Sequence, residues 1–468
     1  MLRASKACEA AGIPTVSLVG DGFMTLAAAA SVGLGMPDIP TATLRGHPGA
    51  QSREEIKRNL GELTAEQVVK RLTTMPPVAL DQSEPSATDI YFSGGFEAVN
   101  HHFYKNELSD GLPIVPPTRE RIEAFLDFTD RDPQEILGVM LPDSRAATIW
   151  SIAVNGVMAG CRPEYMPVLV TLVEAMLDPH YGIEHSGNTP GGETLIVLNG
   201  PIIRELEFNY TQGVMRDGFL ANTSVGRFWR LYVRNVAGFL PHKNDKATYG
   251  NTWRVVIAEN EEVLARIGWE PICIDNGIAK GKNAVMIARY TGGNILSSVS
   301  GSTPEEMMPY LTDGLTKLSS SWQLVFTVGG HGNSLRPLVL LSPIHAEMLS
   351  RAGWTKQDIK KYLFAHARVP AWQFERQLRD WSQKPIWNLA EEYRLGHIPE
   401  VFCESDDPNR LVPIVCTEND FMIAVTGDPA RNSAYVFAHQ GELGYPVGRE
   451  IHLPKDWANK LAATRSND

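Results

Sequence analysis

The segment HSGNTPGGETLIVLNGPIIREL, residues 185–206, shows how this chain folds. Its run TLIVL is short, apolar and rich in β-branched residues, which is typical of a buried strand. A Gly-rich stretch precedes the run. Gly200 and Pro201 follow it, where proline suits the first turn of a helix. The segment therefore predicts a loop, a buried strand and a helix, an order that is typical of α/β proteins.

A similar pattern recurs further along the chain without a gap. Glu164 matches Glu306 and Pro201 matches Pro343, and both pairs are separated by the same 142 positions. Both copies have the pattern helix, Gly-rich loop, strand, proline turn, helix. We therefore predict an internal duplication of residues 164–206 and 306–348 within one α/β domain. The alternative is chance similarity, since proline and glycine recur at turns for local reasons.

The remaining sequence divides into an N-terminal unit, a linker and a large domain. Residues 1–75 alternate between helical and strand patterns, which predicts a small parallel α/β unit that lacks its first strand. Residues 76–89 are rich in proline, serine and acidic residues, and we interpret them as a linker. Residues 90–468 form the large α/β domain that holds the two repeats.

Three local patterns carry more specific predictions. Ser52 with Glu55, and Thr64 with Gln67, have the spacing of a capping box at a helix N-terminus. The stretch DPQEILGVM, residues 132–140, predicts a helix that begins after an aspartate N-cap. The stretch AATIWSIAVNGVMAG, residues 146–160, is apolar nearly all round and predicts a buried element.

Composition and charge exclude several classes of function. The chain of 468 residues is 43% hydrophobic and 21% charged, as in globular proteins. Its net charge of -11 argues against a surface for nucleic acid or anionic membrane. No apolar run is long enough to span a bilayer, and the N-terminus lacks a signal-peptide pattern. Five widely spaced cysteines without a CxxC motif predict free thiols and a cytoplasmic location.

The two Gly-rich loops carry the candidate site. His185 and His331 lie in the two loops, where a histidine could act as acid, base, carbonyl polariser or metal ligand. Glu193 could add a carboxylate. The alternative is that these are loop histidines hydrogen-bonded to the backbone. No metal-ligand motif is present, so a divalent metal is only a candidate cofactor and the cofactor is otherwise unknown.

Other residues could bind an anionic substrate. Glycine lets backbone N–H groups approach a ligand, so the loops supply a first set of candidates: Asn188, Gly191, Gly192, Gly330 and Asn333. Arg227, Arg230 and Arg234 share one helical face, which could clamp a carboxylate or phosphate. A solvated or acid-paired face is the alternative. His242, Lys243 and Lys246 follow in the sequence.

Cys161 follows the buried apolar element and precedes an arginine. A neighbouring guanidinium could lower the pKa of a thiol and make it a nucleophile, so this cysteine is a further catalytic candidate. The alternative is that Cys161 is simply a buried side chain.

Several motifs resemble one known family. The stretch AGIPTVSLVGDGF (residues 11–23) resembles the later part of the UGSC-type (seleno)protein domain. The stretches SDGLPIVPPTRERI (109–122), AVNGVMAGCRPEYMPV (153–168) and GNTPGGETLIVLNGPI (187–202) resemble a large C-terminal region fused to it in bacterial members. The family motif, selenocysteine or cysteine followed by Gly-Ser-Cys, resembles a redox centre. That motif is absent here, and Cys8 is not a substitute by position.

We therefore expect a cytoplasmic bacterial enzyme of small-molecule metabolism, with its site between the two Gly-rich loops. The resemblance implies redox or lyase chemistry at a carbon–heteroatom bond, whereas the histidines favour metal-assisted hydration or hydrolysis. A non-catalytic subunit that docks a thiol- or selenol-bearing partner is the second class. Expected partners are an anionic small molecule, and either further copies of the chain or a small thiol-bearing subunit. Nucleic acid and membrane are not expected.

Overall fold

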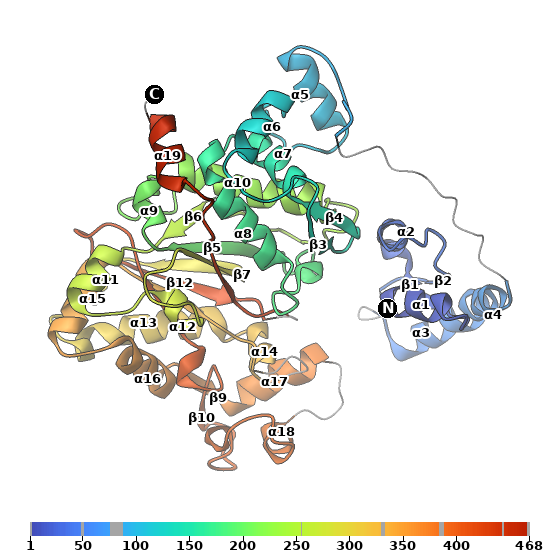
Figure 1. Ribbon diagram of the computed structural model, residues 1–468. Coiled ribbons are helices and arrows are strands. Elements are labelled where there is room, and N and C mark those ends of the chain that lie inside the picture. Colours follow the sequence, from blue (N-terminus) through green and yellow to red (C-terminus); the bar gives the residue numbers. More distant parts are fainter. Residues whose placement is uncertain are drawn as a thin grey trace.

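The computed structural model describes residues 2–47, 51–74, 88–253, 255–328, 333–382, 388–441 and 444–465 (Figure 1). The linker interpretation falls mostly outside these ranges, since only residues 88 and 89 of the linker are described. Among the described residues, no helix is both long and apolar enough to cross a membrane.

The N-terminal unit is a parallel α/β unit, as predicted. Strands β1 (Ser17–Gly20) and β2 (Thr41–Leu44) pair in parallel. Four helices accompany them: α1 (Leu2–Ala10), α2 (Met24–Gly33), α3 (Arg53–Asn59) and α4 (Ala65–Thr73). The Ser52 capping box is confirmed, because the Ser52 hydroxyl accepts from Glu55 N and the Glu55 carboxylate accepts from Ser52 N.

The second predicted capping box is wrong. Thr64 makes no cap hydrogen bond at the start of α4. Gln67 Oε1 instead accepts from Thr43 N at 2.8 Å, and Thr64 Oγ1 donates to Thr43 O at 2.9 Å. Both side chains therefore bind the backbone of β2, where a strand edge offers unpaired groups.

One curved sheet organises the large domain. In the described residues its strand order is β11-β8-β12-β7-β5-β6, with β13 paired to β7. The strands are β5 (Glu193–Asn199), β6 (Val256–Ala258), β7 (Ala284–Leu296), β8 (Leu338–Leu341), β11 (Met422–Val425), β12 (Ala434–His439) and β13 (Val447–Glu450). The α/β class is therefore confirmed.

The two halves of this sheet have the same strand arrangement. Strand β5 lies between parallel β6 and antiparallel β7, and β8 lies between parallel β11 and antiparallel β12. Strands β7 and β12 pair antiparallel at the centre. The strand within each predicted repeat, β5 or β8, is therefore the middle strand of its half-sheet. Duplication of the sequence itself stays a prediction.

The sheet curls until its two edges meet at one end. Asn260 N, after β6, donates to Val425 O of β11 at 2.7 Å, and Thr426 Oγ1 donates to Ala258 O at 2.8 Å. Alternate side chains face the concave side and form one apolar cluster, as the two-residue period of a strand requires. Its members include Leu195, Val197, Met286, Tyr290, Leu338, Leu340, Ala424 and Phe437.

Helices cover the convex side in two groups on opposite sides of the curved sheet (Figure 1). Over β5, β6 and β7 lie α7 (Ile149–Ala159), α8 (Met166–Met176) and α10 (Leu220–Asn235). Over β8, β11 and β12 lie α13 (Pro304–Ser319), α16 (Lys356–His366) and α17 (Ala371–Ser382). Helix α7 is buried, as its apolar composition predicts, and it ends at left-handed Gly160.

The remaining elements lie around these layers. The further helices are α5 (Phe96–Lys105), α6 (Arg119–Leu126), α9 (Ile202–Glu205), α11 (Glu261–Ile267), α12 (Ile272–Asp275), α14 (Val325–Val328), α15 (Pro343–Arg351), α18 (Leu389–Arg394) and α19 (Trp457–Arg465). Two antiparallel pairs join β3 (Ile136–Met140) to β4 (Arg145–Thr148) and β9 (Arg368–Pro370) to β10 (Leu411–Pro413). The helix predicted for residues 132–140 is wrong, because most of this stretch is β3.

Candidate functional site

The first Gly-rich loop is fixed in place by backbone hydrogen bonds from the segment that follows α10. Lys246 N donates to Gly187 O at 3.0 Å and Asn251 N donates to Gly191 O at 3.1 Å. Asn188 closes the turn inside the loop, because its side chain accepts from Gly191 N and donates to His185 O. Asn188 and Gly191, which we predicted to bind substrate, thus shape the loop. Their role toward a ligand stays a prediction.

A partly buried ion triad joins this loop to α10. Arg230 donates to Glu193 Oε2 at 3.0 Å and to Asp245 Oδ2 at 3.1 Å. The nearby charge of Glu193 raises the pKa of the Arg230 guanidinium. Two of the predicted site residues, Glu193 and Arg230, are therefore brought together. Each already has an ionic partner, so this arginine alone is a weak anchor for a further anion.

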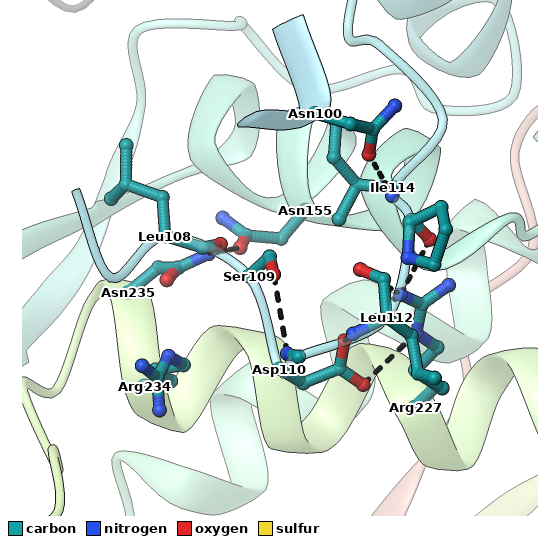
Figure 2. A network of polar contacts seen from close by, with 12 residues as sticks. Asn100, Leu108, Ser109, Asp110, Leu112, Ile114, Asn155, Arg227, Arg234 and Asn235 are labelled. Carbon is teal, nitrogen blue, oxygen red and sulfur yellow. Dashed lines mark hydrogen bonds and ion pairs between the residues drawn. The ribbon is translucent and has the colours of Figure 1, made fainter. Parts of the chain in front are cut away.

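Arg234 differs from its neighbours on α10 because part of its guanidinium is uncommitted. Its Nε donates to Glu107 O at 2.9 Å, and within the described chain neither Nη1 nor Nη2 makes a hydrogen bond or an ion pair. Figure 2 shows this head group apart from the adjoining polar network. Burial lowers the pKa of Arg234, and the charge of Arg230 acts in the same direction. An anion placed here would offset both effects.

These side chains line a cavity of about 770 Å³, which we call the basic cavity. Its wall combines α10, the first Gly-rich loop and residues 241–252. The side chains most relevant to ligand binding are Thr189, Arg230, Arg234, His242, Lys243, Lys246 and Asn251, with Asp110 and Asp245 as the acidic members. Lys243 is paired with Glu107, whereas no described residue pairs with the Lys246 ammonium group. The cavity lining therefore contains more basic than acidic side chains, although the whole chain has a net negative charge.

Arg227, the third arginine of the face, is committed to the protein itself. It grips Asp110 with two hydrogen bonds of 3.1 and 2.9 Å and also donates to Pro113 O at 2.9 Å (Figure 2). Asn235 and Asn100 hold the two flanks of the same loop by bonds to Leu108 O and Ile114 N. The motif SDGLPIVPPT is thus fastened onto α10. The predicted contact between Arg227 and substrate stays a prediction.

The N-terminal unit contributes to the same region. Gly22, Phe23 and Leu26, at the start of α2, also line the basic cavity. Residues 1–74 match the UGSC family. The expected family is therefore confirmed for this unit, while residues 75–468 have no family match. No curated protein matches the chain.

A second cavity, of about 620 Å³, lies where the UGSC unit faces the loop of His185. Its lining includes Leu18 and Phe23 of the UGSC unit, and His185 and Asn188 of the large domain. His185 Nε2 lies 3.8 Å from Glu184 Oε1. In the described residues Glu193 contacts Arg230 and its own neighbour Thr194 rather than this histidine. A histidine–carboxylate pair formed by His185 with Glu193 therefore gains no support.

The second Gly-rich loop is described only in part. Gly330 and His331 lie outside the described residues, so their predicted roles are untested. Asn333 has a left-handed backbone, with φ of 57°, and its N–H donates to Thr327 O at 2.8 Å. Among the described residues, no three histidine, cysteine or acidic side chains form a group that could hold a metal ion.

The buried cysteines of the large domain are held as neutral thiols. Burial raises the pKa of Cys161, Cys273 and Cys416 to about 12 in each case. Thiolate, rather than thiol, is the nucleophilic form of cysteine. The catalytic role predicted for Cys161 therefore gains no support from its surroundings.

His439, at the end of β12, was not among the main sequence candidates. It is buried, and its Nδ1 accepts from Arg336 N at 3.2 Å. Burial lowers the pKa of His439 to about 3, and the charges of Arg336 and Arg289 act in the same direction. The burial of His439 could not be predicted from its position near the chain end, because the residues that surround it come from strands distant in the sequence.

Acid is expected to destabilise the folded chain through His439. The folded-state pKa of about 3 lies below the ordinary value, so this contribution to stability is complete above about pH 6.5 and is lost as the pH falls toward 3. When the pH falls from 7 to 4.5, the unfolding free energy of the native chain should decrease by about 2–3 kcal/mol more than that of His439→Asn. Urea denaturation at both pH values measures the difference. Parallel losses in the two proteins would contradict the assignment.

Proposed function

We propose that this chain is an enzyme of small-molecule metabolism that binds an anionic substrate in the basic cavity. The observation that carries the proposal is the half-buried Arg234, which lies near the guanidinium of Arg230. Its two Nη groups make no hydrogen bond or ion pair with any described residue. Proteins hold such groups where a carboxylate or phosphate will neutralise them. Lys246 and the hydroxyl of Thr189 add further donors to the lining of the same cavity.

For the reaction class we rely on the family resemblance rather than on the cavity. The UGSC match over residues 1–74 favours redox or lyase chemistry at a carbon–heteroatom bond. The buried thiols of the large domain do not supply a nucleophile for it at neutral pH. The five free cysteines agree with the proposed cytoplasmic location.

Replacing Arg234 tests the anion-binding role directly. We expect Arg234→Gln to weaken binding of inorganic phosphate about tenfold or more, since a hydrogen bond to a charged group contributes about 1.5–3 kcal/mol. The thermal midpoint without anion should stay the same or rise, because the variant removes a guanidinium whose burial is only partly offset by Glu107, Asp110 and Asp245. Isothermal titration calorimetry measures the first effect and scanning calorimetry the second.

The matched control is Arg351→Gln, which removes the same charge from an exposed position on α15. It should leave phosphate binding unchanged. Equal phosphate affinities in the native chain and the Arg234 variant would overturn the proposal.

A second candidate function is a subunit that docks a thiol-bearing partner. The observation that favours it is the two-stranded sheet of the UGSC unit, in which β1 and β2 pair only with each other among the described residues. Thr64 and Gln67 already bind the edge of β2 at Thr43, so the edge of β1 is the one that could accept a strand from another chain. Purification of the native complex would test it. A stoichiometric partner carrying Cys-Gly-Ser-Cys is required, and a single-component complex would exclude it.

A further inference from the structure

Arg289 is a buried cation at the centre of the sheet without an anionic partner. It lies on β7 and is 2% exposed, and no described residue forms an ion pair with it. Its Nη2 donates to Gly182 O at 2.9 Å and to Ser186 Oγ at 3.2 Å. Its Nε and Nη1 have no hydrogen-bond partner among the described residues.

Gln440 brings a second unsatisfied group to the same place. It follows β12 directly, is fully buried, and donates its backbone N–H to Arg289 O at 2.8 Å. Within the part of the chain that the structure describes, neither Nε2 nor Oε1 of its side chain has a hydrogen-bond partner. The missing partner must therefore both accept and donate a hydrogen bond, whichever way the amide is turned.

The local backbone is shaped to bring these two groups together. The pairing of β12 with β7 shifts by one residue between Ala438 and His439, which is a β-bulge beside the site. Gly192 of the first Gly-rich loop lies over both groups. A Cβ at this position would lie 1.8 Å from Gln440 Oε1 and 3.2 Å from Arg289 Cγ. Gly444 approaches from another side, since its Cβ would lie 3.4 Å from Arg289 Nη1.

Burying a guanidinium without a counter-charge is strongly unfavourable, and so is burying an amide with both ends unpaired. Arg289 and Gln440, which are neighbours in space, have four buried polar atoms without a described partner, and this is more than one place in a native core usually contains. From this we infer that Arg289 and Gln440 form a binding site for a small oxyanion that carries its own O–H or N–H donor. A 2-hydroxycarboxylate and hydrogen phosphate both have this chemistry.

This site is separate from the basic cavity and goes beyond the proposed function. Neither Arg289 nor Gln440 lines that cavity. Arg289 shares its side of β7 with Ile287 and packs against Tyr181, whose ring lies 4.9 Å from its guanidinium carbon. Arg234 and Arg289 can therefore be replaced independently, and the two proposals can fail independently.

The test is thermal unfolding of the full chain in buffers of equal ionic strength, with glycolate, acetate, phosphate or potassium chloride as the variable salt. Glycolate or phosphate should raise the midpoint in a saturable way. Acetate should bind at least about tenfold more weakly than glycolate, because it leaves Gln440 Oε1 without a donor. A comparison of the responses to glycolate and to phosphate shows whether the site prefers a 2-hydroxycarboxylate or hydrogen phosphate.

Two variants locate the effect. Arg289→Met should abolish the excess of the glycolate response over the acetate response. Without oxyanion, its midpoint should equal or exceed that of the native chain, since the variant removes an unpaired buried charge. Gly192→Ala should reduce the affinity about tenfold or more by displacing the flexible Gln440 amide. Arg234→Gln should leave the excess of the glycolate response over the acetate response unchanged, and Arg351→Gln controls for net charge.

Three results would overturn the inference. The first is no response of the native chain beyond that in potassium chloride. The second is an equal response in the native chain and in Arg289→Met. The third concerns Glu442, which lies outside the described residues. If Glu442→Gln creates or strongly increases oxyanion binding, its carboxylate is the natural occupant of the site.

Discussion

Replacing Glu259 by alanine is expected to lower the unfolding free energy of the large domain by about 3–5 kcal/mol. This carboxylate is buried where the two edges of the curved sheet meet. It accepts from Asn199 Nδ2 and Ile272 N, both at 2.8 Å, and from Val425 N at 3.1 Å. Lys356 Nζ lies 3.6 Å away and has no hydrogen-bond partner. Alanine would leave the N–H groups of Ile272 and Val425 without an acceptor and Lys356 without its anion, whereas Asn199 Nδ2 would keep its bond to Glu261 Oε1 at 3.1 Å.

Urea denaturation followed by tryptophan fluorescence measures this loss. Glu305→Ala is the matched control, because it removes the same charge from an exposed position in the first turn of α13. Its effect should stay within about 0.5 kcal/mol. A loss below about 1 kcal/mol for Glu259→Ala would mean that this carboxylate does not join the two half-sheets.

The second large effect is expected at Asp110. Its carboxylate is almost fully buried and pairs with Arg227 at 2.9 Å, so Asp110→Ala would leave a poorly exposed guanidinium without its anion. We expect a loss of about 3–5 kcal/mol in unfolding free energy. The loop of residues 109–118 should also become the first segment of the large domain to exchange its amide hydrogens.

A double-mutant cycle separates this pairing from the loss of side-chain volume. Asp110→Leu combined with Arg227→Met replaces both charges by apolar groups. The pair should be less destabilised than Asp110→Leu alone, because no buried charge is left unpaired. If the double variant is as unstable as the sum of the two single variants, the ion pair does not hold the loop onto α10.

Periodicity and turn residues were enough to predict the elements with strong local signals. The run at residues 194–198 is the buried strand β5, and the apolar stretch 146–160 contains the buried helix α7. The prediction of a helix for residues 132–140 was wrong, because strand pairing with β4 determines the conformation of this stretch. Val139 lies opposite Ala146 in an antiparallel pair, and Asp132 Oδ1 accepts from Gln134 N in a turn instead of capping a helix.

The candidate site could be predicted only where its residues share one element. Helical spacing placed Arg227, Arg230 and Arg234 on one face of α10, but their different partners come from distant segments. Arg289 and Gln440 lie 151 positions apart, and only the pairing of β7 with β12 brings them together. A charged residue within the apolar run AVMIARY was the one sequence signal for that cluster.

The most direct test of the central claim is equilibrium dialysis of the native chain and Arg234→Gln against one mixture of anionic metabolites. Mass spectrometry then identifies the compounds that each protein concentrates. The account predicts that the native chain concentrates at least one carboxylate or phosphate ester and that the variant concentrates it about tenfold less. If both proteins concentrate the same anions equally, or neither concentrates any, the basic cavity is not an anion-binding site.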